Sequence, residues 1–163
     1  MTTRSPRLSP ARRTFQDYLQ LTKPRIVLLL LFTTLTAMVV AAQGKGLPAQ
    51  TVLATAVGGW LAASGSGVLN QYLDRDIDGR MSRTKNRPIP AGRVRPGRAL
   101  LFGLTLLVLA LVVLGWGANG LTAVLAFIGM VYYIFVYTIL LKRRSALNIV
   151  IGGGAGAMPV LVG

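Results

Sequence analysis

The sequence predicts an all-α membrane protein, a polytopic helical bundle with about five transmembrane helices in its 163 residues. Composition is the first reason. Hydrophobic residues make up 53% of the chain, charged residues only 13%, and the mean hydropathy is +0.58, whereas a soluble domain carries about 25% charged residues. The second reason is the arrangement of charge: the net charge of +14 lies in short blocks between long apolar runs. This pattern argues against a nucleic-acid-binding protein, which would gather its basic residues on one folded face.

Five apolar segments are long enough to cross a hydrocarbon core of about 30 Å at 1.5 Å per residue, the shorter ones only just. They are residues 26–42, 51–68, 99–116, 121–141 and 146–163. The second and fifth are rich in glycine and alanine, which allow close helix packing in lipid. We therefore predict packing surfaces at Gly58, Gly59, Ala63, Gly65, Gly67, Gly152, Gly153, Gly154 and Gly156.

Residues 1–25 form a basic leader, and residues 26–163 form the membrane domain. Thr14–Leu21 within the leader is predicted to be a short amphipathic helix on the membrane surface, with Phe15, Tyr18 and Leu19 facing lipid. An arginine-rich leader is also typical of an organellar transit peptide, which stays as an alternative.

The basic residues predict the orientation of the chain. Seventeen of the eighteen lysines and arginines fall on one side of an alternating topology, and only Lys45 falls on the other. By the positive-inside rule, the N-terminus is cytoplasmic. We expect a multi-pass protein of the bacterial inner membrane, with the mitochondrial inner membrane as the less favoured alternative.

Cysteine and histidine are both absent from the sequence. This excludes disulfides, thiolate or imidazole metal ligands, and catalytic dyads built on histidine. Any bound metal must have oxygen ligands, and Mg²⁺ is the first candidate.

The polar stretch 70–88 is the candidate site, because it contains Asp74, Asp76 and Asp78, three of the four acidic residues of the chain. If the second span continues as a helix, Asn70, Asp74 and Asp78 are four residues apart and share one face, whereas Asp76 points away. Gly79 marks the predicted end of this helix. One amide and two carboxylates can hold Mg²⁺ and leave positions for phosphate oxygens, so these three are the predicted metal-binding and catalytic residues.

The alternative is that the acids are solvated and form ordinary exposed ion pairs with Arg75, Arg80 and Arg83. We favour a site because charged groups at a membrane mark function. The neighbouring cations also set topology, but beside carboxylates they suit a metal-bridged diphosphate. These cations are Arg80, Arg83, Lys85, Arg87 and, after the fourth span, Lys142-Arg143-Arg144.

The motif Asn-x-x-x-Asp-x-Asp-x-Asp-x-x-Met-x-Arg-Thr-x-x-Arg-Pro, from Asn70 to Pro88, resembles the first aspartate-rich motif of the UbiA-type intramembrane prenyltransferases. Met81–Thr84 and Arg87–Gly92 resemble the members that farnesylate haem. Further similar stretches extend the resemblance over nearly the whole chain; they are Leu21–Ile26, Tyr137-Thr138, Leu141–Arg143 and Asn148–Pro159.

The resemblance implies a fold of about nine spans, of which this chain holds the first half. It implies that Mg²⁺ bridges the diphosphate of farnesyl diphosphate to Asn70, Asp74 and Asp78, with Arg83, Arg87 and Lys142 as candidate diphosphate contacts. The allylic cation then alkylates a vinyl group of haem B, with water added, to give haem O. Haem B is a substrate here, and Mg²⁺ is the cofactor.

The family's second aspartate-rich motif is missing from this sequence, so we expect a truncated chain that is inactive alone. The partners expected are membrane lipid, a complementing C-terminal half or a downstream haem A synthase, and no nucleic acid. Three alternatives stay open: a prenyltransferase for a quinone, chlorophyll or other lipid-phase acceptor, half of a cation or substrate transporter, and a structural scaffold. Transporters place ionisable groups near the midplane of the bilayer, whereas these acids cluster at one surface.

Overall fold

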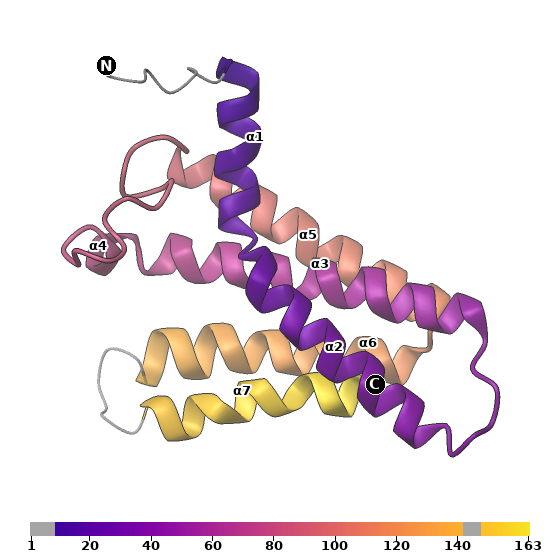
Figure 1. Cartoon of the computed structure of the whole chain (residues 1–163). Helices are drawn as coiled ribbons and strands as arrows, with labels where there is room; N and C mark the ends of the chain where they lie inside the picture. The colour runs from indigo at the N-terminus through magenta and orange to yellow at the C-terminus, as the bar shows by residue number, and fades with distance from the viewer. Residues whose placement is uncertain (1–8, 142–147) are drawn as a thin grey trace, which may run out of the picture.

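The computed structural model describes residues 9–141 and 148–163, and over these ranges the chain is helical without strands (Figure 1). The elements are α1 (Pro10–Leu21), α2 (Pro24–Ala41), α3 (Ala49–Leu73), α4 (Arg75–Asp78), α5 (Pro96–Gly117), α6 (Gly120–Val131), the π-helix η1 (Tyr132–Leu141) and α7 (Asn148–Val162). The predicted all-α bundle is confirmed.

Four helices are long and apolar enough to cross a membrane: Pro24–Ala41, Ala49–Leu73, Pro96–Gly117 and the continuous Gly120–Leu141. They correspond to the first four predicted spans. The fifth segment is a helix too, but α7 has only 15 residues, which cover roughly 22 Å at 1.5 Å per residue. Four spans plus a shorter apolar helix therefore replace the five predicted spans in the described part of the chain.

Two layers of helices are crossed by α2 (Figure 1). Helices α3 and α5 run side by side in one layer, and α6 with η1 lies beside α7 in the other, while α2 contacts both α3 and α7. The fourth span changes to a π-helix at Tyr132. A π-helix has a wider turn than an α-helix and often occurs at functional sites, and hydropathy alone does not predict it.

Small residues bring α3 and α5 together, as the sequence predicts. A Cβ added at Gly65 would lie 2.9 Å from the backbone oxygen of Gly103, and one at Gly58 would lie 2.5 Å from Leu114 Cγ. The prediction is wrong for Gly153 and Gly156, where an added Cβ would meet nothing within 4 Å. A run of glycines shows only that another helix can approach closely. Whether it does so depends on where α7 lies.

The leader helix begins at Pro10, four residues earlier than predicted, because proline suits the first turn of a helix. Phe15 and Leu19 are exposed, as expected for residues that face lipid. Tyr18 is not: its ring lies edge-on against Phe102 of α5, with centroids 5.1 Å apart. Leu21 is fully buried in an apolar cluster with residues of α3, α5 and the loop between them. Helix α1 is therefore fixed to the bundle through one face.

Replacing Gly65 by alanine tests the α3–α5 contact. We expect a loss of about 1–3 kcal/mol of unfolding free energy, because the methyl group overpacks against backbone. The matched control is Gly46→Ala in an open turn, where an added Cβ meets nothing within 4 Å, and its effect should stay within about 0.5 kcal/mol. Thermal unfolding of the purified protein in detergent measures both. Equal midpoints for the two variants would contradict this account of the packing.

Candidate active site

The three predicted metal-binding residues lie at the end of α3 and just beyond it. Asn70 is in the last turn of α3, Asp74 stands between α3 and α4, and Asp78 is the last residue of α4. The helix breaks at Asp74, with φ −86° and ψ 1°, yet the amides of Asp74 and Asp78 still bond to the carbonyls four residues earlier. All three side chains are buried, at 3%, 1% and 3% exposure, whereas Asp76 is exposed. The predicted continuous helix is therefore wrong beyond Leu73, but the three residues predicted to act together are buried and Asp76 is not.

Asn70 joins three elements through its side-chain amide. Its Oδ1 accepts a hydrogen bond of 2.9 Å from Lys23 Nζ, and its Nδ2 donates to Asp74 Oδ2 at 2.9 Å and to Thr138 Oγ1 at 3.2 Å. Thr138 in turn donates to the carbonyl of Tyr133, at 2.9 Å. Lys23 precedes α2 and Thr138 belongs to η1, so this network ties α2, α3 and η1 together at one end of the bundle.

Lys23 adopts a backbone conformation that is uncommon for a lysine. Its φ of 53° and ψ of 55° lie in the left-handed region, which costs free energy in residues other than glycine and occurs where the surroundings impose it. Here it forms the bend between α1 and α2. The bend brings a lysine from the leader into contact with Asn70.

Asp78 is paired with Arg87 from the loop that follows α4. Arg87 Nη1 lies 2.5 Å from Asp78 Oδ2, and the carboxylate is only 4% exposed. The hydroxyl of Thr84 donates to the backbone oxygen of Asp78 at 3.0 Å, which fixes the loop to the end of α4. The Asp78 carboxylate differs from one in a screened surface pair, because removing Arg87 would leave a desolvated charge without this partner.

These contacts separate the predicted site residues into two groups. The structure buries Asn70, Asp74 and Asp78, pairs Asn70 with Asp74, and pairs Asp78 with the half-buried Arg87. Arg83 is exposed on the loop. Arg75, a partner of the acids in the alternative interpretation, lies over the ring of Tyr72 and donates to its carbonyl. Lys142 lies outside the described residues. The alternative of fully solvated acids therefore does not fit Asp74 and Asp78.

Sequence reasoning did not identify Lys23 and Thr138 as site residues. Lys23 was assigned to the basic leader, and Thr138 lies within an apolar span. Both belong to short stretches that carry the family resemblance, Leu21–Ile26 and Tyr137-Thr138, and this was the available signal. Lys23 is 47 residues from Asn70 in the chain, and Thr138 is 68 residues from it. No local sequence pattern predicts contacts over such separations.

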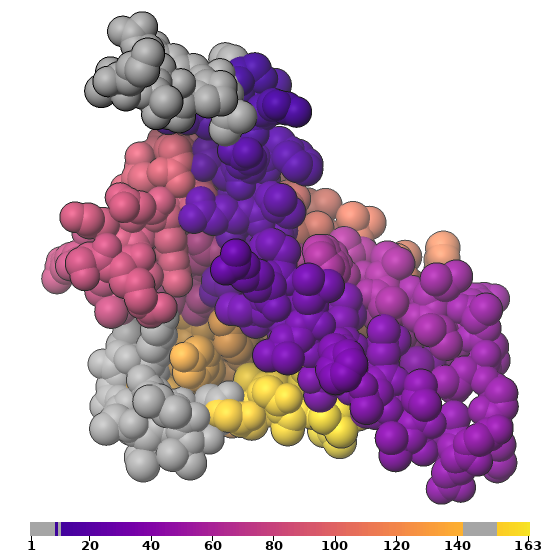
Figure 2. All heavy atoms as spheres, in the orientation of Figure 1, coloured from indigo at the N-terminus to yellow at the C-terminus, as the bar shows by residue number. Residues whose placement is uncertain are grey.

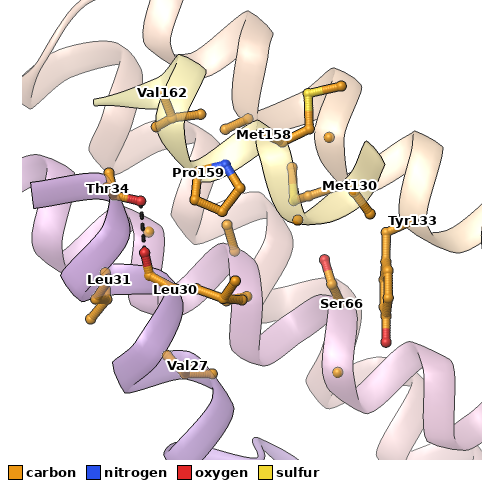
Figure 3. A pocket seen from close by; sticks show the side chains of 18 of the residues that line it. Val27, Leu30, Leu31, Thr34, Ser66, Met130, Tyr133, Met158, Pro159 and Val162 are labelled. Atoms are coloured by element: carbon orange, nitrogen blue, oxygen red, sulfur yellow. Dashed lines mark hydrogen bonds between the residues drawn. The ribbon is translucent and has the colours of Figure 1, made fainter. Parts of the chain in front are cut away.

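An apolar cavity of about 420 Å³ adjoins the network (Figure 3). Lys23 lines one end of it, together with Tyr133 and Tyr137, whose rings stack with centroids 5.5 Å apart. The remaining walls are aliphatic side chains, small residues of α3 and residues of α7. Figure 3 shows Val27, Leu30, Met130 and Pro159 around this space. The cavity therefore has a cationic end at Lys23, which bonds to Asn70, and an apolar interior. Its volume is within the size range of small-molecule sites.

The donor atoms of the cluster fit a hard cation. They are oxygens from two carboxylates and one amide, the ligand type that Mg²⁺ prefers. Asn70 Oδ1 and Asp78 Oδ2 already hold cationic groups of the chain itself, Lys23 and Arg87. No set of three acidic, histidine or cysteine side chains able to hold a metal occurs among residues 9–141 and 148–163. The oxygens are thus of the type that a hard cation prefers, and the described residues by themselves form no complete set of ligands.

The family described as the UbiA prenyltransferase family matches residues 30–163, and the chain belongs to it. This membership favours an enzyme over the transporter and scaffold alternatives.

The curated relatives carry one particular name, protoheme IX farnesyltransferase. The chain is 53% identical over 149 residues to the protein of that name from Roseiflexus sp. (strain RS-1), covering 91% of this chain and 28% of the relative. It is 53% identical over 146 residues to the Synechococcus elongatus protein, covering 90% and 46%. It is 45% identical over 162 residues to the Streptomyces coelicolor protein, covering 99% and 51%. The chain thus spans between about a quarter and about half of these relatives. No solved structure matches it.

Replacing Lys23 by methionine tests the buried network. Asn70 Oδ1 would lose its charged donor, and we expect about 1–3 kcal/mol less unfolding free energy. Lys45→Met is the matched control, because Lys45 is an exposed residue after α2, and the change should be within about 0.5 kcal/mol. Thermal unfolding in detergent compares them, and a Lys23 variant as stable as the control would refute the role given to this contact.

Proposed function

We propose that the chain is the part of a protohaem IX farnesyltransferase that binds farnesyl diphosphate and opens its C–O bond. The observation that carries this proposal is the burial of Asn70, Asp74 and Asp78 together with the hydrogen bond from Lys23 to Asn70, because Lys23 lines an apolar cavity. A prenyl diphosphate is complementary to this arrangement, because it has an anionic head and an apolar tail. The name shared by relatives about 50% identical over nine-tenths of the chain supports haem B as the acceptor.

The dimensions of the cavity suit a 15-carbon chain. Along α2 and the residue before it, the lining extends from Lys23 to Thr34, roughly 16 Å at the helical rise of 1.5 Å per residue. With carbon–carbon bonds of about 1.5 Å, an extended farnesyl chain is roughly 14 Å long. A tail of this length can lie between the cationic end and Thr34. Thr34 bonds its hydroxyl to the carbonyl of Leu30, at 3.0 Å, so its polar atom is satisfied within α2.

In the reaction, the bond between farnesyl C1 and the diphosphate oxygen breaks, and diphosphate leaves with the electron pair. The vinyl group of haem B attacks C1, water adds to the resulting cation, and one proton is lost, which gives haem O. Bound Mg²⁺, held by Asp74 and Asp78 with the Asn70 amide, would neutralise charge on the leaving diphosphate. Arg87 and Lys23 add positive charge beside the carboxylates, and the apolar walls exclude water from the allylic cation. Arg83 and Lys142 are candidate contacts to the diphosphate.

We place the protein in the bacterial inner membrane with its N-terminus and the site on the cytoplasmic side, because seventeen of the eighteen basic residues fall on that side of the topology. Farnesyl diphosphate would then reach the site from the cytoplasm. Membrane lipid, a complementing C-terminal half and a downstream haem A synthase are the partners proposed.

Prenyl transfer itself is the first test. Membranes containing the chain receive haem B, farnesyl diphosphate and Mg²⁺, with and without a co-expressed C-terminal half of a relative, and haem O is measured by mass. We expect product that depends on Mg²⁺ and on the added half. The double variant Asp74→Asn/Asp78→Asn should lose at least tenfold in rate, because it removes two carboxylate charges from the site. The exposed Asp76→Asn is the matched control and should stay within about twofold. Equal rates for the two would contradict the assignment.

Filling the cavity tests where the tail lies. Ala63 lines the cavity, and Ala63→Phe should weaken binding of farnesyl diphosphate severalfold while the shorter geranyl diphosphate is less affected. Val57→Phe is the control, since Val57 is an exposed residue of α3 that does not line the cavity. Competition against a fluorescent prenyl diphosphate in nanodiscs measures both. Equal effects of Ala63→Phe on the two chain lengths would place the tail elsewhere.

A further inference from the structure

The loop between α4 and α5 carries Arg87 on a compact turn. The amide of Ala91 bonds to the carbonyl of Arg87 at 3.0 Å, and the amides of Arg93 and Val94 bond to that of Pro88 at 2.9 and 3.0 Å. Gly92 has φ +71°, a conformation that glycine adopts readily. Pro88 and its neighbour Ile89 are buried under this turn. Residues 87–94 therefore form one unit, and the position of Arg87 depends on where the unit is held.

Arg93 connects this unit to α1. Its Nε donates to Asp17 Oδ1 at 2.7 Å, and its Nη2 donates to Gln20 Oε1 at 3.3 Å and to the carbonyl of Asn86 at 3.0 Å. Asn86 is the residue immediately before Arg87. Asp17 is only 8% exposed and is the one acidic residue of the chain outside the polar stretch 70–88. A single guanidinium thus joins α1 to the backbone next to Arg87.

Helix α1 is itself well anchored, so it can serve as a fixed point. Gln71 of α3 donates to the carbonyl of Leu21 at 2.8 Å, and Tyr18 lies edge-on against Phe102 of α5. Figure 2 shows α1 in contact with the surface of the loop. The guanidinium suits this role because its planar fork can reach several acceptors at once, which an ammonium cannot do in the same geometry.

We propose that Arg93 is a positioning residue of the candidate active site. Held by Asp17 and Gln20 of α1, it fixes Asn86 and the following turn, and so keeps Arg87 against Asp78. Removing this contact frees the turn to move away from α4, which leaves the buried Asp78 carboxylate without its partner. The structural part of this inference stands on the contacts alone, whereas its effect on diphosphate binding rests on the proposed function.

Hydrogen exchange of the loop amides tests the structural part in the whole chain in nanodiscs. Arg93→Ala should speed the exchange of the amides of Ala91 and Val94 at least tenfold. Arg98→Ala is the matched control, because it removes the same charge from an exposed position at the start of α5, and it should change exchange less than twofold. Asp17→Asn keeps the other two acceptors and should have an intermediate effect. Swapping the charges in Asp17→Arg/Arg93→Asp should recover part of the protection. Unchanged exchange in Arg93→Ala would overturn the proposal.

Binding of farnesyl diphosphate with Mg²⁺ tests the functional part on the same samples. We expect the dissociation constant to rise severalfold in Arg93→Ala and to stay within twofold in Arg98→Ala. Faster exchange with unaltered binding would overturn the positioning role. If the unaltered chain binds no farnesyl diphosphate while Arg93→Ala still speeds exchange, the proposed function fails and the structural link remains.

Discussion

The hydrogen bonds of the buried Asn70 side chain are the interactions on which this structure depends most. Its amide accepts from Lys23, donates to Asp74 and Thr138, and so joins α2, α3 and η1 at one end of the bundle. Polar groups inside a membrane protein are costly unless they are satisfied. Each of these residues therefore needs the others in place, and one amide both holds three helices together and bonds to the Asp74 carboxylate.

The apolar cavity depends on the same arrangement. Small residues of α3 let α5 approach closely on one side, while α2 crosses to α7 on the other, and the space between α2, α3, η1 and α7 is left open. Had α3 carried large side chains, that space would be filled. The packing that stabilises the bundle thus also forms a chamber whose cationic end lies next to Asn70.

Helix α1 and the loop after α4 form a second region, at the surface of the bundle. Arg93 connects them, and Arg87 connects the loop to Asp78. The motif residues on α3 and α4 are thus supported from two directions, by buried hydrogen bonds from within the bundle and by ion pairs from the loop. Helix α1, expected as a surface helix with Tyr18 toward lipid, is part of this support because Tyr18 and Leu21 pack inward.

The sequence by itself determined the all-α class, the four long spans and the separation of Asn70, Asp74 and Asp78 from the exposed Asp76, because hydropathy and helical periodicity are local properties. It also carried the family resemblance in its motif. Only the tertiary structure decided that Lys23 and Thr138 reach Asn70, that Asp78 pairs with Arg87 while Arg83 stays exposed, and that Gly153 and Gly156 make no close contact. These outcomes depend on how helices cross and where the chain bends, as at Lys23. Such contacts join residues far apart in the chain, and no local pattern encodes them.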